Sequence, residues 1–230
     1  MRRITLSKLK AYFSLEEIRR RTQKRIRRLL RTYHSKQLNN KDFTIISNNC
    51  WGGIVYEYYD VIKQSPTVGL FFMAKDYVKF CANLKYYTTN LELVFINPYQ
   101  SKYYEQLKDL NAFGSYPIGV LDDIEIMFLH YHTKEEAKEK WERRCERINW
   151  DKLILKFNDQ NGCTEDDARA FLSLPFKNKL FFTIHEDWKL DSCSNFYIIE
   201  QHTKDGSITA SHEPYGNNRY FNLTSMINDL

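Results

Sequence analysis

The chain has 230 residues, a length that favours one globular domain and leaves little room for a second. It contains only 8 Gly and 5 Pro, whereas Phe, Trp and Tyr make up 15% of its residues, and this composition excludes collagen-like, linker-rich and largely disordered chains. No stretch approaches the roughly 18 consecutive apolar residues of a membrane-spanning helix, and the N-terminal residues lack the apolar run of a secretory signal, so we expect a cytoplasmic protein.

The net charge of +5 is unevenly distributed. Residues 1–41 contain 14 Lys and Arg against two Glu, a net charge of +12, while residues 42–230 carry a net charge of −7. This change of composition predicts two parts: a basic amphipathic helical arm over residues 1–41, and a single α/β domain over residues 42–230.

Within the arm, Ser14 and Glu17 have the spacing of a capping box, and the apolar residues that follow predict one helix from Leu15 to Tyr33. Three roles are compatible with this helix: peripheral contact of residues 14–36 with the anionic inner face of the cell membrane, contact with nucleic-acid phosphates, or docking of its apolar stripe on the body. The arm's few aromatic residues do not interleave with the arginine run as a base-stacking platform requires, which disfavours nucleic acid.

From Asp42 onward, short β-branched or aromatic runs alternate with amphipathic stretches, a pattern typical of an α/β protein. Several runs are apolar on both faces, as in a sheet covered by helices on both sides. We therefore expect a three-layer sandwich with a mainly parallel or mixed sheet. Its predicted strands are Phe43–Ser47, Thr67–Phe72, Glu92–Ile96, Ile124–Tyr131, Leu153–Phe157, Leu180–Ile184 and, late or at an edge, Phe196–Glu200.

Helix-capping residues lie between these strands. The expected helices are Tyr77–Tyr87 after a cap at Asp76, Lys102–Leu110 after Ser101, a charged helix that follows the capping box of Thr133 and Glu136 and ends near Ile148, and a helix that follows the capping box of Thr164 and Asp167 and contains Phe171.

Open α/β sheets bind ligands outside the carboxyl ends of their strands. Here these ends are rich in polar residues: Asn48, Asn49, Cys50, Trp51, Gly52 and Gly53 after the first predicted strand, Lys75 after the second, His130 and His132 after the fourth, Asn158, Asp159, Gln160 and Asn161 after the fifth, and His185 after the sixth. Because parallel strands end at the same edge, we expect the loops Asn48–Gly53 and Asn158–Gly162 to face each other across one cleft, with His130 or His132 within reach.

The loop Asn48–Gly53 is a candidate phosphate site. Two Asn and a Gly pair between a strand and a helix let backbone N–H groups approach an anion, while a tight turn is the structural alternative. Cys50 is a candidate thiolate nucleophile, because a helix N-terminus lowers the pKa of a thiol; a structural thiol is the alternative. The chain has five cysteines, an odd number with no CxxC pair, so we expect reduced thiols.

Acid–base candidates follow the fourth and fifth strands. Asp159 in the sequence FNDQNG can act as a general base, and its neighbours can bind sugar hydroxyls, although this composition also suits a plain turn. His130 and His132 share one face of a strand, so one of them can serve acid–base chemistry or contact substrate, with packing or capping as the alternative. Two histidines alone are too few ligands for a metal ion, and their spacing does not indicate where a third ligand would come from, so no metal site is predicted. The sequence also indicates no particular cofactor.

Long stretches of the body resemble a known family. They are FTIISNNCWGG (Phe43–Gly53), PTVGLFFMAKDYVKF (Pro66–Phe80), YPIGVLDDIEIMFLHY (Tyr116–Tyr131), KWERRCERINWDKL (Lys140–Leu153) and KFNDQNGCTE (Lys156–Glu165). The body is similar from Phe43 to about Phe182 to the bacterial family called domain of unknown function 1919. This resemblance implies an α/β fold and a place in exopolysaccharide or capsule biosynthesis, and it supplies no catalytic residues.

These observations together predict an enzyme of cell-surface polysaccharide biosynthesis that transfers or modifies a sugar at the cytoplasmic membrane face. The expected partners are a nucleotide sugar or a lipid-linked saccharide, with Trp51 or Trp188 as an apolar platform for the sugar. The alternative is a non-catalytic component of polysaccharide assembly that binds a carbohydrate or another protein.

Overall fold

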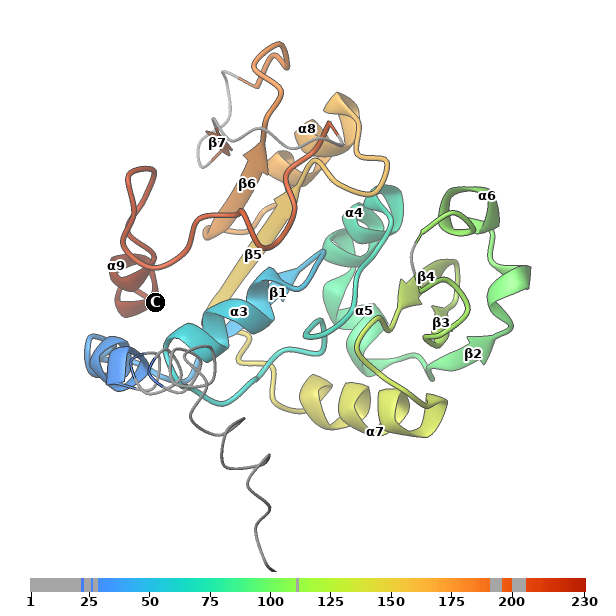
Figure 1. The fold of residues 1–230 in the computed structure, drawn as a ribbon, viewed down its shortest axis with the longest axis horizontal. Coiled ribbons are helices and arrows are strands. Elements are labelled where there is room, and N and C mark those ends of the chain that lie inside the picture. The colour runs from blue at the N-terminus through green and yellow to red at the C-terminus, as the bar shows by residue number, and fades with distance from the viewer. Residues whose placement is uncertain (1–21, 23–25, 27–28, 111, 191–195, 200–205) are drawn as a thin grey trace, which may run out of the picture.

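A computed structural model describes residues 22, 26, 29–110, 112–190, 196–199 and 206–230. The larger of its two sheets contains β1 (Thr44–Ser47), β5 (Leu153–Asn158), β6 (Lys179–Thr183) and β7 (Phe196–Ile198), in that spatial order (Figure 1). Every neighbouring pair in this sheet is parallel. The sequence therefore located all four strands to within one or two residues at each end.

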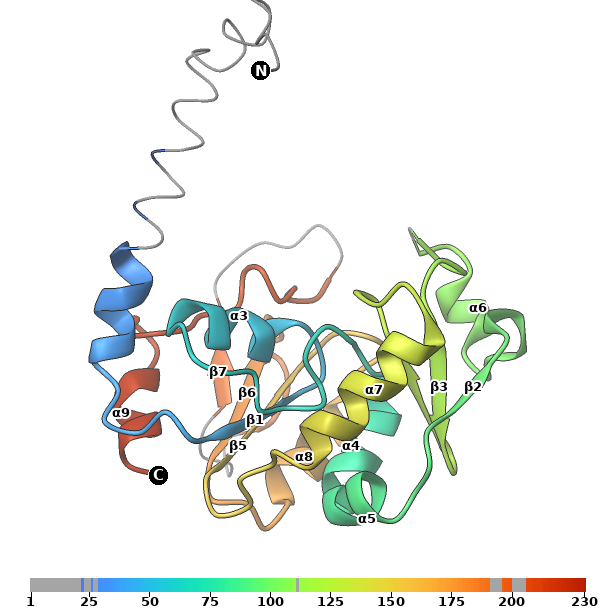
Figure 2. The same ribbon diagram turned by 90° about the horizontal axis from the view of Figure 1, so that it is seen from below.

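Helices cover both faces of the parallel sheet. On one face, Ile46 and Phe157 pack with residues of α4 (Ala74–Ala82) and α8 (Glu165–Ser173). On the other, Ile45 and Ile154 pack with residues of α3 (Trp51–Tyr58) and α9 (Leu223–Asn228). Figure 2 shows the sheet between α3 on one side and α4 and α8 on the other. The strands are apolar on both faces because both faces are covered, and the predicted mixed α/β fold is confirmed.

The second sheet is antiparallel and holds β2 (Val94–Ile96), β3 (Ile118–Leu121) and β4 (Ile124–Met127) in that order. β3 is not among the predicted strands, and it forms a tight hairpin with β4. Asp122 in the turn has a φ of 54°, a left-handed conformation that short polar side chains tolerate. The predicted strand Thr67–Phe72 is wrong, because this segment forms only one isolated bridge, between Phe71 and Met127.

The remaining helices are α5 (Leu84–Thr89), α6 (Tyr104–Leu107) and α7 (Lys134–Cys145), with a 3₁₀ turn at Pro98–Gln100. The predicted N-terminal caps of α7 and α8 are confirmed, since the side chain of Thr133 accepts from the Glu136 amide and Thr164 forms a full capping box with Asp167.

The predicted cap at Asp76 is wrong, because α4 begins two residues before it. The buried Asp76 carboxylate instead accepts from the Glu125 amide at 2.8 Å and pairs with Lys102 at 2.9 Å. Asp76 therefore joins α4 to the small sheet.

The part of the arm that the structure describes includes a helix over residues 29–36, whereas the predicted capping box at Ser14 and Glu17 lies outside the described residues. Leu29 and Tyr33 are 65% and 59% exposed. The chain contacts the body just after them: His34 stacks on Tyr58, and Leu38 is buried among the residues around α3 and α9. Among the described helices, none is long and apolar enough to span a bilayer.

Candidate active site

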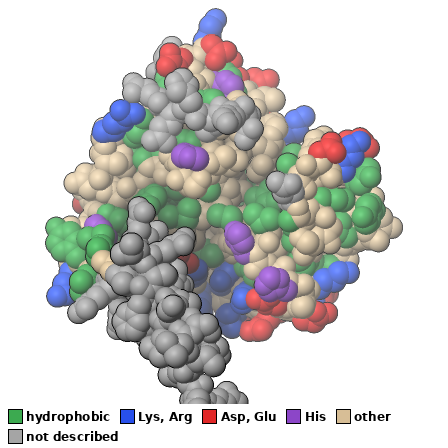
Figure 3. Space-filling model, viewed as in Figure 1, with side chains coloured by type: hydrophobic (Ala, Val, Ile, Leu, Met, Phe, Trp, Pro, Cys, Tyr) green, Lys and Arg blue, Asp and Glu red, His purple; other side chains and the backbone are tan. Residues whose placement is uncertain are grey.

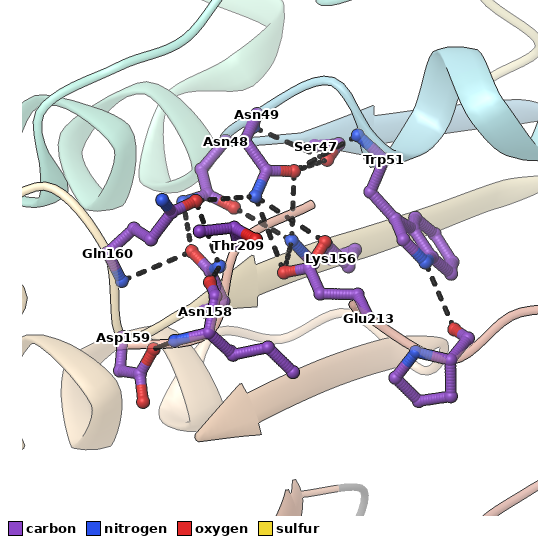
Figure 4. Close-up of polar contacts among 12 residues, drawn as sticks. Ser47, Asn48, Asn49, Trp51, Lys156, Asn158, Asp159, Gln160, Thr209 and Glu213 are labelled. Carbon is purple, nitrogen blue, oxygen red and sulfur yellow. Dashed lines mark hydrogen bonds and ion pairs between the residues drawn. The ribbon is translucent and has the colours of Figure 1, made fainter. Parts of the chain in front are cut away.

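The loops that follow β1 and β5 lie side by side, as predicted, because the two strands are parallel neighbours. The side-chain amide of Asn48 donates to the Asn158 oxygen at 2.7 Å, and that of Asn49 donates to the Gln160 oxygen at 3.1 Å (Figure 4). Asn48 and Asn158 are fully buried. Their amides therefore hold the two loops together and have no exposed surface for a ligand.

Lys156 lies beneath these loops and is not among the predicted site residues (Figure 4). It is fully buried, forms an ion pair with the buried Glu213, and donates to the side-chain oxygens of Asn48 at 3.2 Å and Asn49 at 3.1 Å. Burial lowers the pKa of Lys156 to about 8, against the opposing attraction of Glu213. Burial likewise raises the pKa of Glu213, against the opposing attraction of Lys156.

We define Lys156, Glu213, Asn48, Asn49, Asn158 and Gln160 as the buried network. One signal for it is present in the sequence, a single lysine within the otherwise apolar strand LILKF. Buried lysines are rare unless paired, so such a residue predicts a buried partner. Nothing in the sequence identifies Glu213 as that partner, because it comes from a segment that follows all four parallel strands.

Cys50 lies at the start of α3, and its Sγ atom is 3.3 Å from Nε2 of His130, within hydrogen-bond distance. We expected His130 to reach Cys50 from the same parallel sheet. This expectation is wrong, because His130 follows β4 of the small sheet. It is positioned by the Phe71–Met127 bridge and by the bond from its own amide to the Gly69 carbonyl at 3.0 Å.

The thiol of Cys50 is largely desolvated. Burial raises its pKa, Lys156 lowers it, and Glu213 raises it further. The expected lowering of this pKa by the helix N-terminus is therefore wrong, because burial has the larger effect, and the sulfur needs a base to accept its proton during attack. Nε2 of His130 is the group at the right distance to do so.

Two cavities meet at Cys50. One, of about 380 Å³, is lined by His130 and by the basic side chains of Lys63, Lys140 and Arg144. Figure 3 shows histidine and basic side chains gathered beside a hollow on this face, over α7. We name this space the basic cavity.

The other cavity, of about 560 Å³, has a mixed lining and is named the mixed cavity. Its polar groups include Asn49, Gln160 and Ser211, and its apolar groups include Phe71 and Leu129. Tyr116 also lines it; this residue is only 4% exposed, and its hydroxyl has no hydrogen-bond partner among the described residues. A buried hydroxyl without a partner is costly, and a ligand hydroxyl in the mixed cavity would satisfy it.

Asp159, predicted as a general base, is 5% exposed, and both of its carboxylate oxygens are occupied. Oδ1 accepts from the Ile208 amide and Oδ2 from the Ile184 amide, each at 2.8 Å. Asp159 thus ties the end of β5 to two other segments. This arrangement favours the turn-forming alternative, and catalysis by Asp159 stays a prediction.

The predicted anion loop is also closely packed. Trp51 is fully buried and donates to the Pro214 carbonyl at 3.0 Å, so it offers no exposed face to a sugar. A Cβ on Gly52 would lie 3.3 Å from Ile45 Cγ2, and one on Gly53 would lie 3.2 Å from Val68 Cγ1. Close packing of α3 therefore accounts for both glycines without a bound phosphate.

The other predicted residues lie around this centre. Asn161 lines the mixed cavity and donates to the Phe72 carbonyl at 2.9 Å. Lys75 is exposed in the first turn of α4. His132 is exposed, and its amide donates to Glu136, while His185 stacks on Trp188 with ring centroids 4.5 Å apart. In the contacts of the described residues, neither His132 nor His185 touches Cys50.

No group of three or more His, Cys, Asp or Glu side chains among the described residues is arranged to hold a metal ion. The acidic residues near β4 have other partners. Asp123 pairs with Lys79 at 2.7 Å, and Glu125 accepts from the Lys102 amide at 2.9 Å. The described part of the chain thus offers Cys50 and His130 as its reactive groups at this edge of the sheet.

Comparison with known proteins shows the family. The family described as "Domain of unknown function (DUF1919)" matches residues 21–229. A Haemophilus influenzae protein named "Uncharacterized protein" is 34% identical over 168 residues, which cover 73% of this chain and 74% of the relative. The family match includes all four strands of the parallel sheet, Cys50, His130 and Glu213. The chain therefore belongs to the DUF1919 family.

Proposed function

We propose that this protein is a group-transfer enzyme that acts on a sugar, with Cys50 as the nucleophile and His130 as the general base. The observation that carries the proposal is the 3.3 Å contact between Cys50 Sγ and His130 Nε2 at the junction of two cavities. Nucleophile and base within hydrogen-bond reach are the signature of covalent catalysis.

In the proposed reaction, Cys50 Sγ attacks an electrophilic carbonyl carbon while Nε2 of His130 accepts the thiol proton. The first N–H of α3, that of Trp51, donates to the Asn49 side chain at 3.1 Å, so the proposal assigns the developing oxyanion to the N–H groups that follow it, which have no partners within the helix. The proton then passes from His130 to the leaving group, and a hydroxyl of the acceptor takes the group from sulfur. Lys156 acts on this step through its charge, which lowers the pKa of Cys50.

The mixed cavity supports a sugar as the acceptor. Its amides and hydroxyls match sugar hydroxyls, and Phe71 and Leu129 match the apolar face of a sugar ring. The predicted role in exopolysaccharide or capsule assembly, with a nucleotide sugar or a lipid-linked saccharide as substrate, fits this lining and forms part of the proposal. The proposal departs from the expected reaction in one respect, because the Cys50 thiol is the nucleophile with His130 as its base, and Asp159 takes no part in the chemistry.

Peripheral binding to the inner membrane face also forms part of the proposal. Exposed Leu29, Leu30 and Tyr33 on a basic helix fit partial insertion between anionic headgroups. Vesicles containing anionic lipid should bind the full chain, whereas neutral vesicles should not, and high salt should release it. Equal binding to both kinds of vesicle would remove this part of the proposal.

A neutral ester substrate tests the proposed chemistry. With p-nitrophenyl acetate, the protein should release a burst of nitrophenol close to one equivalent, with acetate trapped on Cys50. Cys50→Ala should abolish the burst, and His130→Ala should slow it by about 10²- to 10⁴-fold. Cys163→Ala is the matched control, because Cys163 is also a half-buried thiol but has no histidine partner among the described residues. A burst that persists in Cys50→Ala would refute the proposal, and absence of a burst from the wild-type protein would favour a non-catalytic binding protein.

A further inference from the structure

The basic cavity next to Cys50 carries more positive than negative charge. Three cationic side chains line it, those of Lys63, Lys140 and Arg144, against one carboxylate, that of Glu57. Glu57 pairs with Lys63 at 2.9 Å. Lys140 is paired with Glu136 outside the lining, so Arg144 is the cation of this lining without an acidic partner among the described residues.

Arg144 is held rigidly in this cavity. Its guanidinium donates to the Val68 carbonyl at 3.1 Å and to the Tyr131 hydroxyl at 2.5 Å, both neutral acceptors. Lys140, one helical turn earlier on α7, is paired with Glu136, which does not line the cavity. A fixed guanidinium beside an ammonium group is the arrangement that proteins use to bind phosphate.

We infer, resting on the function proposed above, that the basic cavity binds the phosphate of an acyl thioester donor and presents its carbonyl carbon to Cys50. A thioester suits this nucleophile because thiol and thioester exchange with little change in free energy, so the acyl group stays activated on Cys50. The mixed cavity on the other side of the sulfur is then left for the acceptor hydroxyl.

The two steps balance without any further reactant. In the first, the bond from Cys50 Sγ to the acyl carbon forms, the carbon–sulfur bond of the donor breaks, and the thiol proton passes through His130 to the departing thiolate. In the second, the bond from an acceptor oxygen to the same carbon forms, the bond from that carbon to Cys50 Sγ breaks, and the acceptor proton passes through His130 to Sγ, so Cys50 is regenerated as a thiol.

Three acetyl donors test the inference on the full chain: acetyl-coenzyme A, acetyl-phosphopantetheine, and the neutral acetyl thioester of N-acetylcysteamine. Intact-mass measurements at short times should show one acetyl group on Cys50, formed faster from the phosphate-bearing donors. Equal rates for the two phosphate-bearing donors would assign the site to their shared phosphate. A faster reaction of acetyl-coenzyme A alone would assign it to the nucleotide phosphates.

Charge removal gives the second arm of the test. In Lys63→Gln/Lys140→Gln, the ratio of the rates with acetyl-coenzyme A and with the neutral thioester should fall about tenfold or more. Lys138→Gln is the matched control, because Lys138 is also on α7 and in an ion pair, at 2.5 Å from Glu92, but does not line the cavity. The control should keep the wild-type ratio.

Equal acetylation of Cys50 by all three donors would overturn the phosphate site while leaving Cys50 as the nucleophile. Reaction with p-nitrophenyl acetate but with none of the thioesters would also overturn the inference alone. Absence of any Cys50 adduct from every donor would overturn the proposed function as well.

Discussion

Two polar clusters lie at the same edge of the parallel sheet and differ in how their groups are satisfied. In the buried network, Lys156 and Glu213 are fully enclosed and bonded to each other and to neighbouring amides. Cys50 Sγ and His130 Nε2 are 3.3 Å apart, and two cavities adjoin them. The difference separates Lys156 and Glu213, which hold the loops in place, from Cys50 and His130, which a substrate can reach. Asn49 and Gln160 do both, because they also line the mixed cavity.

Loss of one charge from the buried network should have the largest effect on stability. Lys156→Met leaves the Glu213 carboxylate buried without its counter-ion, and we expect the free energy of unfolding to fall by about 3–5 kcal/mol. Urea denaturation measures this change. Lys156→Met/Glu213→Leu, which removes both charges, should be more stable than the single variant. A single variant as stable as wild type would show that the network is not a structural element.

Asp159→Asn should have the next largest effect. The substitution replaces a carboxylate that accepts two backbone amides by a group with one acceptor oxygen and a donor that faces an N–H. We expect a loss of about 1–3 kcal/mol of stability, measured by urea denaturation. Turnover per folded molecule should stay close to wild type. A drop of about 10²-fold or more in turnover with unchanged stability would restore Asp159 as the general base.

Cys50→Ala should affect stability least, because its thiol is half-buried and lies beside open cavities. We expect a change below about 1 kcal/mol in the free energy of unfolding together with loss of the nitrophenol burst. Parallel denaturation and burst measurements on the same preparation provide the comparison. A loss of stability as large as that of Lys156→Met would place Cys50 within the buried network.

The pH dependence of Cys50 alkylation should reveal a small electrostatic effect of the buried network on the thiol. Because the pKa of Cys50 is raised, its alkylation by iodoacetamide should keep accelerating into the alkaline range. Loss of the Lys156 charge should raise this pKa further and slow alkylation a few-fold, while Glu213→Gln should lower it and speed alkylation. Shifts in the same direction for both variants would exclude this electrostatic account.

Much of the fold follows from local sequence patterns. Each strand of the parallel sheet is a short apolar run, and the capping boxes at Thr133 and Thr164 are local signals that the structure reproduces. The segment Thr67–Phe72 has the same apolar pattern but pairs at only one residue. Strand pairing depends on which segment lies alongside, and composition alone does not specify that neighbour.

The candidate site could be predicted only in part. The parallel arrangement of β1 and β5 was enough to bring Asn48 and Asn158 together. His130 comes from a different sheet, so its contact with Cys50 depends on how the two sheets pack. The pairing of Lys156 with Glu213 depends in the same way on a segment without regular structure, whose path no periodicity encodes.

The place of Glu213 in the chain has a consequence for synthesis on the ribosome. Asn48 and Asn158, whose side chains join the two loops, are 110 positions apart in the sequence. Glu213 follows its partner Lys156 by 57 positions. The ribosome therefore makes all four strands of the parallel sheet before it makes the carboxylate that neutralises Lys156. Until then the lysine has to stay hydrated or lose its proton, because burial lowers its pKa and the opposing attraction of Glu213 is missing. A nascent chain thus cannot complete this edge of the sheet until the segment that contains Glu213 emerges, and a chain terminated before Glu213 leaves Lys156 without its counter-ion.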